Sequence, residues 1–449
     1  MIAPPLPKDP AELQRVEHTR LRRRVVYSMH EDDVMGRLKQ TVGNVRKEAW
    51  PPADMTANPA RHVYQQLSGL YRQVPEVKPP DGAEDVAAAI SEAGWWQLAQ
   101  RNQRDTLALN DHLVHVDIVE DEPVYRLVPP DMVSVEVNPA RPSEIVAVRE
   151  WAKDPDKPDE WVQYVTDPRT STYAALDSRG DDVSARVLKG EFSGDAYRWQ
   201  VDGKPALPYI AYHAAETGYA FDPFSAREVF DGSLQLGVYY TLLAHVMADA
   251  SWAQRYAIGA EVAGLSISDD APRAEVITDP AMLLMLRADP DHPGQPVVGQ
   301  WTAPLAPTEL LSAIERYERR VVEMALGTVG VSRRESDVRS AASLAVSREA
   351  QREAQRSYEP LFRRSDLALC RLTSGLMGAP TSGWRISYKS LPRDAHELAA
   401  ETERLIAQVE AGLLDRVTAY QQLHPGLTRD EASAAVSQIS SINRATAPA

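Results

Sequence analysis

The chain has little cysteine, no excess of positive charge and no long apolar segment at its start. Its 449 residues include one cysteine, Cys370, so no disulfide can form within one chain, which fits a reducing cytoplasm. The 64 acidic and 49 basic residues give a formal net charge of −15. This charge opposes tight, sequence-specific binding of nucleic acid through a basic face. The N-terminus lacks an apolar h-region, so we expect no secretory signal.

Signature motifs of several common enzyme classes are also lacking. The sequence contains no glycine-rich phosphate loop followed by lysine, no HExxH, no paired CxxC and no GxSxG. The apolar surroundings of Cys370 favour a small core residue over a catalytic thiol. We therefore expect no enzyme activity, no catalytic residue, no cofactor and no bound metal.

One polar cluster offers an alternative to this expectation. His112, His115 and Asp117 are residue types that bind divalent metals, and they support the hypothesis of a metal-dependent hydrolase. Apolar residues alternate with this polar set, as in a strand with one buried face. The pattern favours the strand.

Residues 222–378 organise the rest of the chain. A capping-box pattern at 225–228 predicts the start of a long helix that runs to about Ile258. Residues 232–248 carry no formal charge and place apolar side chains on more than one face, which predicts a helix buried on most sides. We expect packing between copies of the chain to bury it.

A membrane span is the alternative interpretation of this charge-free window, because its length is near the lower limit for crossing a bilayer. Gln235, His245, two glycines and the flanking acids Asp231 and Asp249 argue against it. We therefore expect no membrane partner.

An insertion, a second helix, a loop and a third helix follow. Residues 263–307 have short apolar runs separated by Asp-Pro and Pro-Gly turn signals, which predicts a small module that relies on its neighbours for burial. The second helix is expected over 308–327. The third begins after Ser340 and continues toward Gly375, with Pro360 expected to kink or interrupt it.

Charged side chains mark one face of the second helix and the loop after it. The helix face is predicted to be solvated or to line a polar channel, and it comprises Glu315, Arg316, Glu318, Arg319 and Glu323. In the loop, Arg333, Arg334 and Arg339 offer charge and hydrogen-bond donors to phosphate without reading base sequence. These arginines favour transient contact with DNA. A second basic cluster at 20–24 is better explained by a solvated helix face than by phosphate contact.

The parts outside the central stretch predict an α+β fold. Residues 112–213 alternate with period two between turn signals, as in a mostly antiparallel sheet packed on preceding helices. The expected strands are 125–128, 133–137, 145–151, 161–165, 172–176 and 209–212. The expected flanking helices are 58–74, 84–109, 394–410 and a terminal helix opened by a capping box at 428–431.

In this order the parts resemble the portal proteins of tailed double-stranded DNA bacteriophages, including those of related prophages and gene transfer agents. The resemblance covers about Asn58 to Ile442. It rests on VYQQLSGLY at 63–71, YRLVPPD at 125–131, the helix–insertion–helix block, SAASLA at 340–345, and the run from EAGLL to LHPGLT at 410–428.

The resemblance implies a ring, commonly a dodecamer, at one capsid vertex, through which DNA is packaged and ejected. It implies a portal-like α+β fold with a β-rich wing, a two-helix stem, a small β-containing clip, a long kinked helix after a tunnel loop, and an α-helical crown. By analogy the wing is 1–223 and 341–390, the stem 224–262 and 308–327, the clip 263–307, the tunnel loop 328–340 and the crown 391–449.

The same resemblance implies the partners. Each chain would contact copies of itself, double-stranded DNA without sequence specificity, the terminase large subunit, a head–tail adaptor, the major capsid protein and a scaffold. Met282, Leu284, Arg287 and Trp301 are the residues expected to dock partners on the clip. The protein would be found in the virion, and in the host cytoplasm during assembly. A phage adaptor or scaffold in a smaller oligomer is the alternative.

Overall fold

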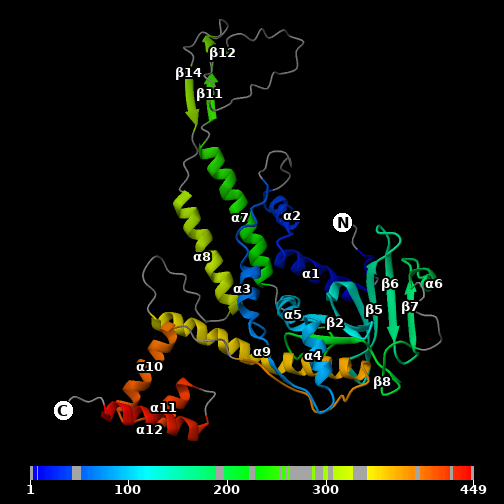
Figure 1. The fold of residues 1–449 in the computed structure, drawn as a ribbon. Helices are drawn as coiled ribbons and strands as arrows, with labels where there is room; N and C mark the ends of the chain where they lie inside the picture. The colour runs from blue at the N-terminus through cyan, green and yellow to red at the C-terminus, as the bar shows by residue number, and fades with distance from the viewer. Residues whose placement is uncertain are drawn as a thin grey trace. The chain divides into compact units, whose positions relative to one another are not determined.

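The computed structural model describes most of the chain as an α+β protein of two compact units (Figure 1). The described residues are 4–7, 9–42, 52–188, 197–221, 228–251, 254–258, 260–262, 286–288, 297–301, 307–326, 341–389, 395–424 and 428–445. The first unit falls within residues 1–23, 62–226 and 326–449, and the second within 24–61 and 227–325.

Helices and strands alternate irregularly along the described residues. The helices are α1 (Pro10–Val26), α2 (Glu31–Val42), α3 (Pro59–Leu67), α4 (Glu84–Glu92), α5 (Trp95–Leu109), α6 (Ser184–Val187), α7 (Glu228–Ser251), α8 (Pro307–Leu326), α9 (Ala341–Leu376), α10 (Ala395–Glu410), α11 (Arg416–Leu423) and α12 (Arg429–Ala445). The strands are β1 (Glu76–Lys78), β2 (Asp111–Val119), β3 (Glu122–Val128), β4 (Val133–Asn138), β5 (Arg141–Lys153), β6 (Trp161–Asp167), β7 (Thr172–Leu176), β8 (Gln200–Val201), β9 (Lys204–Pro205), β10 (Tyr209–His213), β11 (Gln254–Ile258), β12 (Ala260–Val262), β13 (Leu286–Ala288), β14 (Val297–Trp301) and β15 (Arg385–Ser387).

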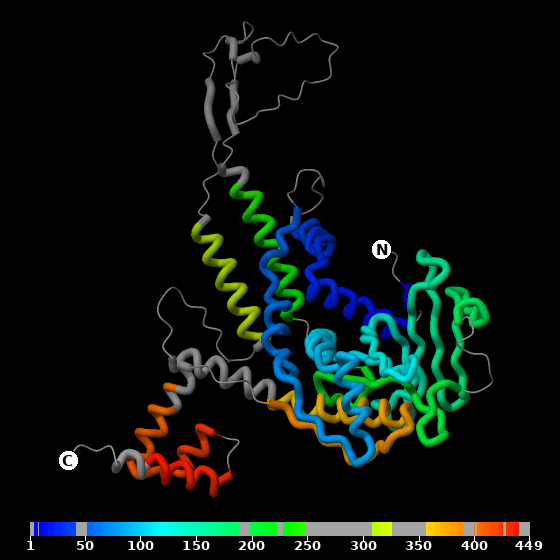
Figure 2. The backbone as a smooth tube through the Cα atoms, in the orientation of Figure 1, coloured from blue at the N-terminus to red at the C-terminus, as the bar shows by residue number. Residues whose placement is uncertain are grey.

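The second unit is built around α7, which α2 and α8 cover (Figure 2). Leu236 and Leu243 of α7 share a buried apolar cluster with Ile314 of α8. The rings of Tyr239 and Tyr317 meet edge to face with centroids 5.4 Å apart. The long charge-free helix is therefore buried on most sides, as predicted, but its own chain covers it. The buried residues of this stretch, such as Leu234, Leu236 and Val238, therefore do not need another copy to cover them, and contact of the partly buried remainder with other copies stays a prediction.

Two glycines allow α7 to pack this closely. A Cβ atom at Gly232 would lie 2.6 Å from Val321 Cγ2 of α8, and one at Gly237 would lie 2.9 Å from Val34 Cγ2 of α2. Distances under 3 Å are not tolerated without movement of the backbone or of the neighbouring side chain. Glycine at these positions is thus required by the closeness of the two helix contacts.

Hydroxyl groups of α7 also hold the first turn of α3 and the segment that precedes it. The backbone N–H of Asp54 donates to Thr241 Oγ1 over 2.9 Å, and that of Ala60 donates to Ser233 Oγ over 3.0 Å. Each hydroxyl in turn donates to a carbonyl within α7, Gly237 and Val229 respectively. The buried polar atoms are therefore paired, which avoids the cost of an unsatisfied group.

The insertion after α7 contains strands, as predicted, but the helix ends earlier than expected. It stops at Ser251 instead of continuing to about Ile258, and β11 follows. β11 pairs antiparallel with β14, and β12 pairs antiparallel with β13. The sequence 254–258 contains Tyr256 and Ile258, which favour strands, and pairing with a distant strand overrides the local helical pattern.

The two largest sheets of the first unit are antiparallel, in agreement with the predicted alternation. One has the order β10-β2-β3 and the other the order β4-β5-β6-β7. Glu120 and Asp121, which connect β2 to β3, both have positive φ angles (51° and 66°), as a tight hairpin turn requires.

α5 and α9 contribute to the main core of the first unit beside the three-stranded sheet. Trp95 of α5, Tyr212 of β10 and Phe362 of α9 are almost fully buried there. α9 runs without interruption through Pro360, so the expected interruption is absent. Proline removes one backbone donor, but the turns on both sides continue the helix.

Two other predicted helices are shorter than expected. The helix expected at 58–74 ends at Leu67, and Leu70 and Tyr71 beyond it enter the core. The helix expected at 84–109 is divided into α4 and α5 at Gly94, whose φ of 72° is left-handed. In contrast, the C-terminal capping box is confirmed, because Thr428 N donates to Glu431 Oε2 over 2.8 Å.

We predict that Gly232→Ala lowers the free energy of unfolding by about 1–3 kcal/mol, because the new methyl group overpacks the contact with Val321. Gly36→Ala in α2 is the matched control. A Cβ there meets nothing within 4 Å, so this change should stabilise the helix by up to about 1 kcal/mol. Chemical denaturation measures both. Equal effects of the two substitutions would contradict the close contact, whereas rescue of Gly232→Ala by Val321→Ala would support it.

Candidate functional site

The loop and clip candidates lie mostly outside the part of the chain that the structure describes. Arg333, Arg334 and Arg339 are outside the described residues, and so are Met282 and Leu284. Of Arg287 in β13 and Trp301 in β14, the structure describes the backbone alone. Arg287 is opposite Glu261 and Trp301 is opposite Gln254 in the strand register. Their roles remain predictions.

The charged face predicted for the second helix lies on α8 and is largely exposed. Glu315, Arg316, Arg319 and Glu323 are exposed, and Arg316 Nε donates to the Ser312 carbonyl over 3.2 Å. Glu318 is the exception, because it is partly buried and hydrogen-bonds Tyr240 of α7. Burial raises the pKa of Tyr240, with the nearby Glu318 and Glu315 as further causes. The face therefore carries a mixture of both charge signs.

The opposite, apolar face of α8 is covered only in part. Ile314 and Val321 are buried, but Leu310, Leu311 and Met324 remain 39%, 39% and 58% exposed. Exposed apolar side chains that continue a buried face are typical of a surface that contacts another protein.

The hydrolase candidates on β2 do not form a common site. Successive residues of a strand point to opposite faces, so His112 lies on the face away from His115 and Asp117. His112 Nδ1 is 2.9 Å from Asn102 Oδ1, and burial lowers the pKa of His112 to about 4. Among the described residues, no group of three His, Cys, Asp or Glu side chains is placed to hold a metal ion.

His115 and Asp117 instead have structural partners. The His115 ring packs edge-on against Trp199 and Tyr209, and burial lowers its pKa to about 3. Asp117 Oδ1 accepts the indole N–H of Trp199 over 3.0 Å, and its Oδ2 lies 3.1 Å from Arg198 Nη2. Both side chains hold the segment after α6 against β2.

The basic cluster of α1 is partly buried and pairs with carboxylates instead of forming a solvated face. Arg20 Nε lies 3.7 Å and Arg23 Nη2 lies 2.8 Å from the buried carboxylate of Asp131, and Arg15 donates to the carbonyls of Pro130 and Val133. Arg24 forms a bidentate pair with Asp33. These pairs attach α1 to the segment around Asp131 in the first unit and to α2 in the second. The expectation of a solvated helix face is therefore wrong.

A buried carboxylate that the sequence analysis did not single out lies at the centre of the first unit. Asp366 of α9 accepts hydrogen bonds from the hydroxyl groups of Tyr71, Tyr212 and Tyr388. Burial raises the pKa of Asp366 to about 6, although all three hydrogen bonds act in the opposite direction. One side chain thus connects α9 to β10 and to the segments after α3 and β15.

A second buried carboxylate joins the two sheets. Glu150 of β5 forms a bidentate ion pair with Arg126 of β3. It also accepts a hydrogen bond over 2.9 Å from the hydroxyl group of Tyr209 of β10. Arg126 is still half exposed, whereas Glu150 is 3% exposed. Such a carboxylate is costly to bury without its partners.

Comparisons with known proteins give similarity in structure but no match to a family model or a curated sequence. The chain aligns with a solved structure described as "Neck of empty GTA particle computed with C6 symmetry" at 13% identity, over 84% of this chain and 94% of that chain, with a TM-score of 0.42. At 13% identity and a TM-score below 0.5, this similarity is weak. Among the described helices, none combines the length and apolar content needed to span a membrane.

We predict that Asp366 makes the wild-type protein more stable, relative to Asp366→Asn, as the pH falls. The pKa of Asp366 is about 6 in the folded state and ordinarily 3.8, so the folded state binds the proton more tightly. The difference in unfolding free energy between wild type and variant should therefore change by about 2 kcal/mol in favour of wild type between pH 7 and pH 4.

Denaturation of both proteins at a series of pH values measures this difference. The groups facing Asp366 are Tyr71, Tyr212, Tyr388 and Cys370. Burial raises the pKa of each of the four, so all stay neutral in this pH range. A difference that stays constant from pH 7 to pH 4 would show that Asp366 keeps its ordinary pKa.

Proposed function

We propose that this chain is the subunit of a phage portal, a ring at one capsid vertex through which double-stranded DNA enters and leaves. The arrangement of the second unit is the observation that carries the proposal. α7 and α8 run side by side in opposite directions (Figure 1), and the paired strands β11–β14 lie between them in the chain. This is the stem-and-clip order that the resemblance implies. In this proposal α7 and α8 form the stem, and β11–β14 belong to the clip.

The uncovered surface of α8 supports a ring. Its own chain buries Ile314 and Val321 but leaves Leu310, Leu311 and Met324 exposed beside charges of both signs. A repeated head-to-tail contact with the next copy would cover such a surface, and a rotation that closes this contact produces a ring.

The charge of the chain suits a channel for DNA. A dodecamer would carry on the order of −180 formal charges, and an acidic wall repels the phosphate backbone at short range. Contacts from a few arginines against this background would be weak enough for a duplex to slide. We assign these contacts to Arg333, Arg334 and Arg339.

The remaining functions follow from a ring that does no chemistry of its own. The clip, with Met282, Leu284, Arg287 and Trp301, would bind the terminase large subunit during packaging and a head–tail adaptor afterwards. ATP hydrolysis would belong to the terminase. The first unit would contact the major capsid protein and a scaffold in the virion.

We predict that the purified chain forms a closed ring of about a dozen copies with a central hole, because the α8 surface is repeated in every copy. Native mass spectrometry gives the number of copies, and negative-stain microscopy shows the hole. Co-expression with a capsid protein is the control for a ring that closes only on a capsid. A monomer or dimer under both conditions would overturn the portal.

We also predict that a triple variant, in which glutamine replaces Arg333, Arg334 and Arg339, packages and retains less DNA. The reason is that the contacts of these arginines with phosphate are lost. The matched control replaces the exposed arginines Arg72, Arg141 and Arg385, which changes the net charge equally. DNA content per assembled particle is the measurement. Equal packaging by both triple variants would remove the DNA role of the loop.

A further inference from the structure

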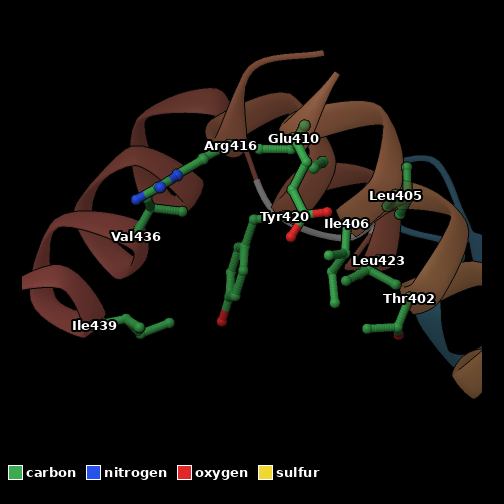
Figure 3. A pocket seen from close by; sticks show the side chains of 11 residues that line it. Thr402, Leu405, Ile406, Glu410, Arg416, Tyr420, Leu423, Val436 and Ile439 are labelled. Carbon is green, nitrogen blue, oxygen red and sulfur yellow. The ribbon is translucent and has the colours of Figure 1, made fainter. Parts of the chain in front are cut away.

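The three C-terminal helices leave an apolar groove between them. The groove has a volume of about 350 Å³, and we call it the C-terminal groove. Its walls include Leu405, Ile406, Val409, Leu423, Val436 and Ile439. Tyr420 of α11 stands between the side chains of α12 on one side and those of α10 on the other (Figure 3).

The walls of the groove are open to solvent. Ile406 of α10 is 51% exposed and Ile439 of α12 is 45% exposed. Both helices are amphipathic, so an apolar side chain of this size would ordinarily be covered. Glu410 and Arg416 are the charged residues of the lining. An apolar groove with charges at few points is suited to an apolar side chain of another protein surface.

The same three-helix segment carries an apolar projection. Leu413, between α10 and α11, is 79% exposed, more than any other large apolar side chain among the described residues. It does not line the groove of its own chain. Every copy of the chain therefore carries one exposed Leu413 and one C-terminal groove.

The backbone holds this projection in place. Gly412 has a left-handed φ of 69°, its N–H donates to the Val409 carbonyl over 3.1 Å, and Leu413 N donates to the Gln408 carbonyl over 2.9 Å. These two bonds form the motif that commonly ends helices, in which the second residue usually packs on an apolar residue of the last turn. The two positions for that partner hold the polar Gln408 and the small Ala407, and Leu413 stays 79% exposed, so the helix end fixes Leu413 without covering it.

We propose that Leu413 of one copy inserts into the C-terminal groove of the next copy in the ring. The inference rests on the ring proposed above and identifies one of its contacts. A projection and a groove at different places on one chain allow a head-to-tail contact, which is the type that a ring repeats, and the ring proposed above selects it over a pair of copies that insert into each other. The groove has room for a leucine side chain, and the insertion covers apolar surface of both copies.

Cysteine cross-linking tests this contact, because the natural Cys370 is buried and does not compete. A tagged Leu413→Cys chain is mixed with an untagged Ile439→Cys chain, assembled and oxidised. We expect a disulfide-linked pair of one tagged and one untagged chain. The yield should be about tenfold above that of the control, because a disulfide forms only when the two Cβ atoms come within about 4.5 Å. The control replaces Leu413→Cys with Val124→Cys, which is 45% exposed on β3.

Native mass spectrometry of the same samples separates the two proposals. Rings without the Leu413–Ile439 link overturn the inserted leucine and leave the portal standing. A Leu413–Ile439 disulfide in a species that is not a ring would support the leucine contact and contradict the proposal that the chain is a portal subunit. Equal yields from Leu413→Cys and Val124→Cys overturn the contact, and the absence of both rings and link overturns both proposals.

Discussion

The second unit depends on how closely three helices approach one another. α7 has no charged side chain over most of its length, so it is stable only where other elements cover it. Gly232 and Gly237 let α8 and α2 approach until side chains fill the space that a Cβ would occupy. The hydroxyl groups of Ser233 and Thr241 then hold the first turn of α3 and the segment before it, and each hydroxyl is itself paired. The helix pair is thus formed within one chain, and association can use other surfaces.

Much of this fold follows from local patterns in the sequence. Period-two alternation identified the strands of both sheets, and Thr428 with Glu431 identified the start of α12. Helix ends were less predictable where a distant partner decides them. The pattern of α7 continues past Ser251, but pairing with β14 makes residues 254–258 a strand. The break at Gly94 had a local signal, since glycine readily adopts the left-handed angle found there.

The buried polar contacts were harder to predict, because their partners are far apart in sequence. Asp366 lies one turn from both Phe362 and Cys370, on the apolar face of α9, and a lone acid on such a face is a signal of a buried site. The sequence does not show that three tyrosines from separate segments meet it. The burial of α7 presents the same difficulty, since the pattern indicates that its faces are covered but not by which elements.

The surfaces that a single chain leaves open indicate how copies would associate. Each copy carries a formal charge of −15, so copies repel one another at a distance, and salt at physiological concentration screens this repulsion beyond about 8 Å. Attraction must then come from short-range apolar contacts, such as those offered by Met324 of α8 and Leu413 after α10. Because each chain carries Leu413 and its groove at different places, satisfying one contact leaves both a free leucine and a free groove at the ends of the assembly. Only a closed assembly leaves neither exposed, and a ring is the closed form of the head-to-tail contact.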